Sequence, residues 1–195
     1  MKKVVFFVLV CCLAANLAGA ADIIKIGLMA PLTGPWASEG QDMEQIVKLL
    51  AEEVNAKGGV LGKQVEVIAE DDGGDPKTAA LAAQRLSTQG VVAVIGTYGS
   101  SITEASQNIY DEAQIIQIAN GSTAVRLSEK GLKYFFRTCT RDDEQGQVGA
   151  ATLQEKGFKK VAILHDNTTY AKGLADETKA LLEGKIEIVF FDALT

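Results

Sequence analysis

Cysteine is scarce in this sequence: among 195 residues only Cys11, Cys12 and Cys139 occur. The first two lie in an apolar run, residues 4–17, which follows a basic start and precedes an A-x-A site at residues 18–20. This pattern predicts a signal peptide over residues 1–20 in preference to a membrane anchor, because the run is short for a membrane span. Cys139 would then remain alone, so no internal disulfide could form. We expect Cys139 to be a small buried residue instead of a catalytic thiol.

Basic side chains are also few, with 19 Lys and Arg against 25 Asp and Glu and a net charge of −6. Removal of the signal peptide takes away Lys2 and Lys3 and no acid, so the charge falls from −6 by two, to −8. The sequence has no basic patch with interleaved aromatic residues. These features argue against nucleic acid as a partner and are consistent with an exported, periplasmic protein.

The residues that build catalytic centres are poorly represented. His165 is the only histidine, and Ser100 stands one glycine short of a nucleophile elbow because Ile102 fills the last position. The acidic loop at residues 71–75 fits neither an EF-hand nor a tetrahedral metal site, and we expect it to be solvated. Residues 96–99 do not match a dinucleotide fingerprint. We therefore expect no enzyme activity, no cofactor and no metal.

What the sequence does contain is a regular alternation of strand and helix patterns from residue 23 onward. Strands are predicted at residues 23–30, 64–70, 91–95, 115–119, 134–138, 160–165 and 185–191. The first predicted helix has its cap at Ser38 and ends at Gly58, and the second has its cap at Asp75, starts at Pro76 and ends at residue 89. Three further helices are predicted over residues 102–113, 142–156 and 168–183. This order predicts an α/β fold with a parallel sheet covered by helices on both faces. In such sheets ligands bind beyond the carboxyl ends of the strands.

The junction at residues 91–101 is the most informative of these strand ends. A short β-branched run stops at Gly96 and Gly99, and a helix follows in which Ser101 and Glu104 have capping-box spacing. The unpaired amides at a helix start suit an anionic group. With the loops after Ala30 and Ala119, this junction predicts a binding site.

The chain ends shortly after a strand, and a second sheet begun near residue 140 would have only about two strands, too few to bury its faces. We expect a first lobe over residues 21–138, an incomplete second lobe over 139–195, and a sequence that is an amino-terminal portion.

Eight segments resemble one protein family. They are IKIG (24–27), PLTGP (31–35), NAKGGVLG (55–62), DDGGDP (71–76), VAVIG (92–96), FRT (136–138), RDDEQG (141–146) and HDNTTY (165–170). Together they resemble branched-chain amino-acid-binding proteins of ABC importers. The resemblance implies a type I periplasmic binding protein, in which two Rossmann-like lobes joined by three crossover segments close on a ligand.

The resemblance also implies ligand contacts. Ser100 matches the position that binds the α-carboxylate of an amino acid, although an N-cap is its ordinary role. Gly121 and Thr123, in a loop with Ser122, match positions that hold the α-ammonium through a carbonyl and both charged groups through a hydroxyl. Tyr170 matches an aromatic residue of the second lobe that covers the ligand. The alternatives are a polar turn for the loop and no role for the tyrosine.

Two departures from the family pattern stand out. Many relatives carry cysteines at the positions of Gly74 and Gly99, where they would join two loops, and both are absent here. Relatives often have Tyr or Trp where this chain has Glu39, and the nearby aromatic is instead Trp36. Glu39 could enter the cleft and admit a polar solute, or it could be a surface charge in the first turn of a helix.

The function implied is that of an extracytoplasmic solute-binding protein. It would capture leucine, isoleucine, valine or a related amino acid and deliver it to an ABC permease in the inner membrane. The alternative is an extracellular sensor domain for amino acids, amides or urea-like solutes, and the genes that neighbour this one would distinguish the two. Because most of the second lobe is missing, we expect these 195 residues to bind leucine far more weakly than a full-length relative, or not at all.

Overall fold

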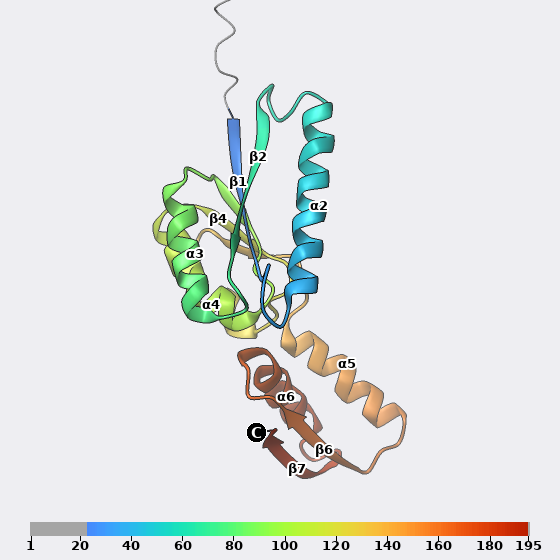
Figure 1. Cartoon of the computed structure of the whole chain (residues 1–195). Coiled ribbons are helices and arrows are strands. Elements are labelled where there is room, and N and C mark those ends of the chain that lie inside the picture. The colour runs from blue at the N-terminus through green and yellow to red at the C-terminus, as the bar shows by residue number, and fades with distance from the viewer. Residues whose placement is uncertain (1–22, 195) are drawn as a thin grey trace, which may run out of the picture.

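Residues 23–194, which the computed structural model describes, form two parallel sheets with helices packed against them (Figure 1). The larger sheet contains β1 (Ile23–Ala30), β2 (Gln64–Asp71), β3 (Ala93–Ile95), β4 (Ile116–Ala119) and β5 (Phe135–Arg137), in the order β2-β1-β3-β4-β5. The smaller sheet pairs β6 (Lys160–His165) with β7 (Glu187–Ala193). The helices are α2 (Ala37–Ala56), α3 (Pro76–Thr88), α4 (Ser100–Glu112), η1 (Val125–Ser128), α5 (Asp142–Glu155) and α6 (Thr169–Leu182). The predicted α/β class with parallel strands is confirmed.

The core of the larger sheet lies between its strands and helices α3 and α4, which Figure 1 shows on the side opposite α2. β1 runs between β2 and β3, and its residues Leu28, Met29 and Ala30 have no exposed surface. Burial on this scale is the main stabilising contribution to such a fold. The core cluster includes Met29, Ala79, Ala82, Ala83, Leu86, Val91, Val94, Ile102, Tyr110 and Ile115.

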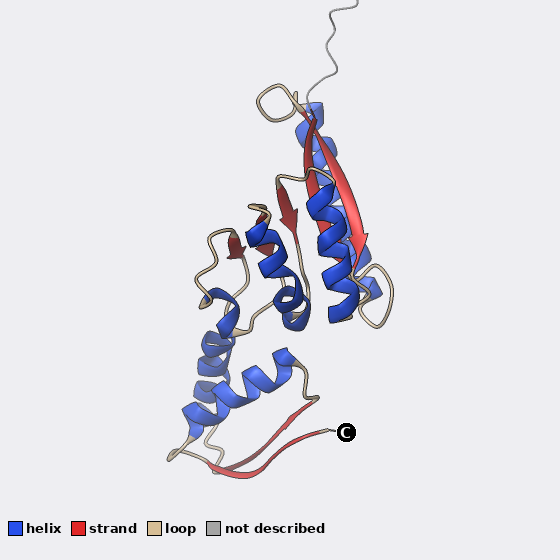
Figure 2. Cartoon of the chain, turned by 90° about the vertical axis from the view of Figure 1, so that its left-hand side faces the viewer, coloured by secondary structure: helices blue, strands red, loops and turns tan. Residues whose placement is uncertain are grey.

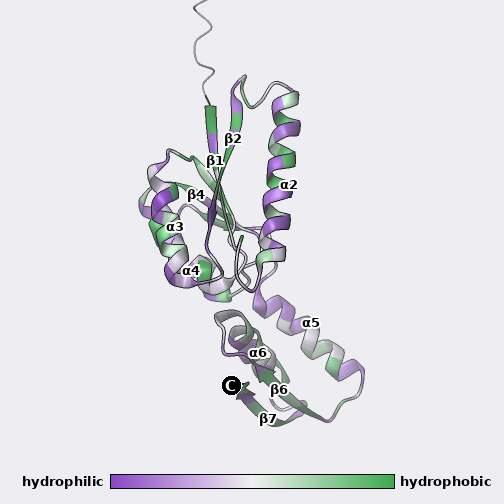
Figure 3. Cartoon of the chain, viewed as in Figure 1, coloured by the Kyte–Doolittle hydropathy of each residue, from purple (hydrophilic) through white to green (hydrophobic). Residues whose placement is uncertain are grey.

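Helix α2 covers the other face of β1 and β2 less completely. Its one buried residue is Gly40, where an added Cβ would lie only 2.1 Å from the carbonyl oxygen of Pro31. Ile46, Leu49 and Leu50 are each more than half exposed. Figure 3 shows apolar and polar segments alternating along α2, as in a helix with one apolar face.

The helix starts test the predicted caps. Asp75 accepts hydrogen bonds from two amides of the first turn of α3, and Pro76 occupies the first helical position, so this cap is confirmed. The predicted cap at Ser38 is wrong, because α2 begins at Ala37 and its N-cap is Trp36, two residues before Ser38. The Ser38 hydroxyl instead donates to the carboxylate of Glu39 at 2.7 Å.

The predicted capping box in α4 is also wrong. The N-cap is Gly99, which has no side chain to accept a hydrogen bond, and Ser101 already lies inside the helix. Glu104 pairs through both carboxylate oxygens with the guanidinium of Arg126, at 2.9 and 2.6 Å. A long-range ion pair has therefore taken the carboxylate that the local pattern assigned to the cap.

The second sheet has helices on one side only. In Figure 2, α5 and α6 both lie on the same side of β6 and β7. A small cluster of Ala150, Leu182 and Ile186 forms between them, whereas Leu164, Val189 and Phe190 are about half exposed. The side of the two strands away from the helices is uncovered within the described residues.

The predicted signal peptide over residues 1–20, with Cys11 and Cys12, lies outside the described residues. Within residues 23–194, no helix combines the length and apolar character that crossing a bilayer requires.

Candidate functional site

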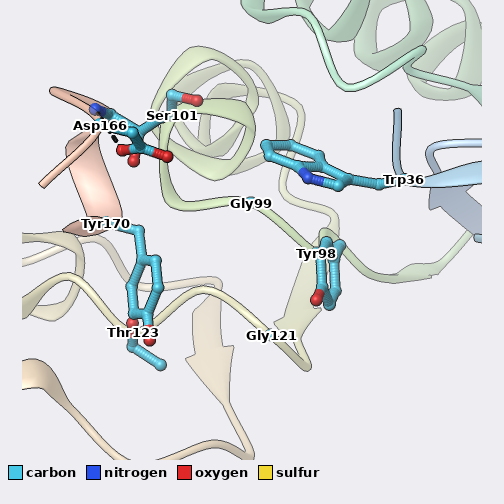
Figure 4. A pocket seen from close by; sticks show the side chains of 9 residues that line it. Trp36, Tyr98, Gly99, Ser101, Gly121, Thr123, Asp166 and Tyr170 are labelled. Atoms are coloured by element: carbon cyan, nitrogen blue, oxygen red, sulfur yellow. Dashed lines mark hydrogen bonds between the residues drawn. The ribbon is translucent and has the colours of Figure 1, made fainter. Parts of the chain in front are cut away.

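A cavity of about 350 Å³ lies where the larger sheet faces the second sheet and its helices. Trp36, Tyr98 and Gly121 reach it from the loops that follow β1, β3 and β4. Its nine lining residues are Trp36, Tyr98, Gly99, Ser101, Gly121, Thr123, Asp166, Thr168 and Tyr170 (Figure 4). In the strand order β2-β1-β3-β4-β5, the next strand in sequence, β2, lies on one side of β1, and β3 lies on its other side. The strand order therefore reverses at β1, and open parallel sheets bind ligands at such a switch point. The three loops singled out in the sequence therefore converge.

Trp36 lines this cavity and Glu39 does not. Glu39 lies in a second, shallow cavity beside Met43, Ile46 and Leu50 of α2. The hydrogen bond from Ser38 lowers the pKa of the Glu39 carboxyl. Of the two alternatives, the structure supports a surface charge for Glu39 and places the aromatic residue at the cavity.

Ser100 is buried beneath the cavity instead of lining it. Its side chain is 2% exposed, and its hydroxyl accepts a hydrogen bond from the amide of Ala124 at 3.2 Å. Ser101, which the sequence assigned to a cap, lines the cavity. Successive side chains of an α-helix are rotated by about 100°, so a start at Ser100 turns these two serines in different directions.

Ser122 also lies below the surface, in a cluster of buried hydroxyls. Its Oγ accepts from the Thr103 hydroxyl at 2.6 Å and donates to the carbonyl of Thr97 at 3.2 Å. A further hydrogen bond joins the hydroxyls of Thr97 and Thr103. These three residues have no exposed surface, so they fix the loop after β4 against the start of α4 and leave Gly121 and Thr123 facing the cavity.

Thr123 lines the cavity and directs its hydroxyl toward a carboxyl group of the second lobe. It is 8% exposed. Its carbonyl accepts the amide of Asp142 at 3.0 Å. Asp142 is fully buried; burial raises the pKa of its carboxyl, and the Thr123 hydroxyl opposes this shift. Thr123 therefore lies between the cavity and a buried carboxyl group.

The opposite wall comes from the end of β6 and the start of α6. The Asp166 carboxylate accepts the amide of Thr168 at 3.0 Å, and this hydrogen bond lowers the pKa of Asp166. Thr168 in turn caps α6 by accepting the amide of Ala171. Tyr170, in the first turn, is 42% exposed, and partial burial raises the pKa of its phenol. The structure thus brings Tyr170 to the same cavity as Gly121 and Thr123.

Three residues were considered for catalysis or metal binding in the sequence, namely His165, Cys139 and Asp72, and none of them lines the cavity. His165 ends β6, as expected, and its ring tilts against Phe191. Cys139 is half-buried, with its thiol 3.4 Å from the Ser122 carbonyl oxygen. Asp72 has no exposed surface, so the expectation of a solvated acidic loop is wrong at that residue. No group of three or more His, Cys, Asp or Glu side chains within residues 23–194 is placed to hold a metal ion.

Five lining residues were not predicted from the sequence as ligand contacts, namely Tyr98, Gly99, Ser101, Asp166 and Thr168. Gly99 and Ser101 flank the predicted Ser100, whereas the other three lie two to four residues before a predicted position. The signal that could have located them is the strand-end rule, applied to the whole stretch from the end of a strand to the first turn of the next helix.

Comparison with known proteins places these observations in context. Residues 23–189 match the family described as "Periplasmic binding protein". An "Amino acid binding protein" of Pseudomonas aeruginosa is 41% identical over 178 residues, covering 90% of this chain and 47% of the relative. "Leu/Ile/Val-binding protein homolog 2" of Brucella abortus is 40% identical over 186 residues, covering 93% and 50%.

A solved structure has the same fold. It is the branched-chain amino acid transporter substrate binding protein LivJ from Streptococcus pneumoniae in complex with isoleucine, with a TM-score of 0.82 and 33% identity. The alignment covers 89% of this chain and 50% of that protein. This chain therefore spans about half the length of the proteins it resembles.

Proposed function

Because this chain belongs to the periplasmic binding protein family, we propose that it captures a branched-chain or related amino acid in the periplasm for an ABC importer. A permease of the inner membrane would receive the solute. The protein would act by binding, without catalysis and without a cofactor. The relatives named for Leu/Ile/Val binding support the solute class.

The observation that carries this proposal is the composition of the cavity. An amino acid needs donors for its carboxylate and acceptors for its ammonium, because an unpaired charge in a partly dry cleft is costly. The first turn of α4 offers backbone amides and the Ser101 hydroxyl, and Asp166 offers a carboxylate. Gly121 and the hydroxyl of Thr123 complete a polar set that suits a zwitterion.

The burial of each predicted site residue indicates whether it would contact the solute or support the loops. Gly121, Thr123 and Tyr170 would contact the solute directly, and Ser101 would provide the hydroxyl that the sequence assigned to Ser100. Ser100 and Ser122 would hold the two loops in register from below. Glu39 would have no contact with the solute.

The mechanism we propose is closure of two lobes, residues 21–138 and 139–195, around the solute. The first lobe would bind the charged groups, and Tyr170 would cover them from the second. Closure of this hinge type sequesters a ligand and changes the outer surface, which a permease can recognise. Cleavage near Ala20 would release the protein into the periplasm.

The test is an NMR titration of the mature chain, isolated from the periplasm after cleavage near Ala20, with L-amino acids up to millimolar concentrations. We expect amide signals of the loops near Ser101 and Thr123 to shift with leucine, isoleucine, valine or a related amino acid, and not with a sugar. Thr123→Ala should weaken the response, whereas Thr140→Ala, an exposed threonine outside the cavity, should leave it unchanged. Absence of a shift with every amino acid would overturn the proposal.

A further inference from the structure

The indole of Trp36 rests on two glycines from different loops. A Cβ added to Gly74 would lie 3.0 Å from Cε3 of Trp36, and a Cβ added to Gly99 would lie 3.0 Å from its Cζ3. Contacts this short are tighter than most Cβ contacts, so a side chain at either position would require the ring to shift by a few tenths of an ångström. The two glycines together therefore form the seat of Trp36.

Tyr98 also packs against the indole. The two rings meet edge to face, with centroids 5.7 Å apart and planes at 68°, which is a favourable aromatic geometry. Tyr98 has a glycine of its own: a Cβ at Gly121 would approach its Cδ2 to 2.9 Å. Three glycines thus allow two rings to form one fixed wall.

The polar and the aromatic residues of the cavity lie at different ends. Figure 4 shows Ser101 and Asp166 gathered at one end, with Trp36 and Tyr98 at the other and Tyr170 across from them. The lining includes no Leu, Ile, Val, Met or Phe, and no Lys or Arg. The large apolar surfaces that a solute could meet here are aromatic rings.

From this arrangement we propose that the cavity prefers an amino acid with an aromatic side chain over leucine, isoleucine or valine. The inference rests on the proposed function, since it assumes an amino acid whose charged groups lie at the Ser101 and Asp166 end. The side chain then lies against Trp36 and Tyr98. An aromatic ring gains edge-to-face or offset stacking with each, beyond the apolar area that any side chain buries.

A cationic side chain would also be attracted to ring faces. The one carboxylate of the lining is Asp166, at the end away from Trp36, and one of its oxygens already accepts the amide of Thr168. A cation at the ring end would therefore lack a counter-charge. The arrangement favours a neutral aromatic group.

The experiment compares dissociation constants of L-phenylalanine, L-leucine, L-valine and L-lysine for the same mature chain by NMR titration. We expect phenylalanine to bind roughly two- to tenfold more tightly than leucine, the range of one favourable ring pair. Trp36→Leu should abolish this preference and Trp36→Phe should retain part of it. Phe158→Leu, a half-exposed ring outside the cavity, should leave the preference intact.

Gly99→Ala tests the seat itself, since its backbone φ of −87° admits alanine and the added methyl group would meet Trp36 at 3.0 Å and Ile102 at 3.2 Å. This variant should reduce phenylalanine binding more than leucine binding. Leucine or valine binding as tightly as phenylalanine would overturn the inference and leave the proposed function standing, and so would tightest binding of lysine. If no amino acid binds, the proposed function itself fails.

Discussion

The hydroxyl of Ser100 accepts a hydrogen bond from the backbone amide of Ala124, 3.2 Å away. Both residues are almost fully buried, so this bond joins the start of α4 to the loop after β4 where water cannot replace it. The serine that the sequence pattern presents as a ligand contact is thus occupied inside the protein. Its neighbour Ser101 faces the cavity.

The first prediction concerns the Ser100 bond. Ser100→Ala should lower the free energy of unfolding by about 1–3 kcal/mol, because the Ala124 amide would be left buried without an acceptor. Urea denaturation measures this change. Ser101→Ala is the matched control and should alter stability by no more than about 0.5 kcal/mol. Equal effects of the two substitutions would contradict the assignment.

The second prediction is that the order of the two serine substitutions is reversed when binding affinity is measured instead of stability. Ser101→Ala should weaken binding of an amino acid by about 1.5–3 kcal/mol, the value of a hydrogen bond to a charged group. Titration calorimetry or NMR titration measures it, at a temperature where both serine variants are folded. Ser100→Ala should have the smaller effect on affinity. If it has the larger one, the carboxylate contact belongs to Ser100 after all.

The third prediction concerns pH. Burial raises the pKa of Asp72 to about 6, whereas an unfolded Asp titrates near pH 3.9. Between these values the folded chain keeps a proton that the unfolded chain has released. Stability should therefore fall as pH rises from about 4 to about 6, and remain lower above that range.

Asp72→Asn isolates this contribution, because an amide oxygen can still accept the Gly74 amide that Oδ1 accepts at 2.8 Å. The free energy of unfolding of the variant, minus that of the parent, should increase by about 2–3 kcal/mol across this pH window. Chemical denaturation at several pH values gives the difference. A difference that does not change with pH would show that Asp72 is ionised normally in the folded protein.

The fourth prediction concerns the buried hydroxyls below the cavity. Thr103→Val keeps the shape of the side chain but removes the donor to Ser122 and the partner of Thr97. We expect a loss of about 1–3 kcal/mol of stability, because polar atoms of the neighbours lose their partners. Thr138→Val, at an exposed position, should be nearly neutral in the same thermal or urea denaturation. A neutral Thr103→Val would show that the cluster contributes little.

The features predicted from sequence are those with local causes. The strand over residues 23–30 coincides with β1, and Asp75 with Pro76 starts α3, because an apolar run and a cap with its proline act within a few residues. His165 ends a strand for the same kind of reason. The convergence of three loops also follows from sequence, since parallel strands bring their carboxyl ends to one edge.

The errors arise where distant residues decide. Glu104 leaves its predicted cap for Arg126, and the loop that buries Asp72 continues β2 alongside Ala30, whose carbonyl accepts the Asp72 amide. The place of Trp36 depends on Gly74 and Gly99, which no local pattern connects to it. Propensity and spacing contain no information on such partners, so the direction of individual side chains at the site could not be derived.

Trp36 is the only tryptophan of the sequence, and its ring forms part of the cavity wall. Emission excited at the red edge of the indole band therefore originates at the binding site and nowhere else in the chain. The protein thus contains its own optical probe: occupancy of the cavity, displacement of the ring from its glycine seat and opening of the surrounding loops should each change this emission without any added label.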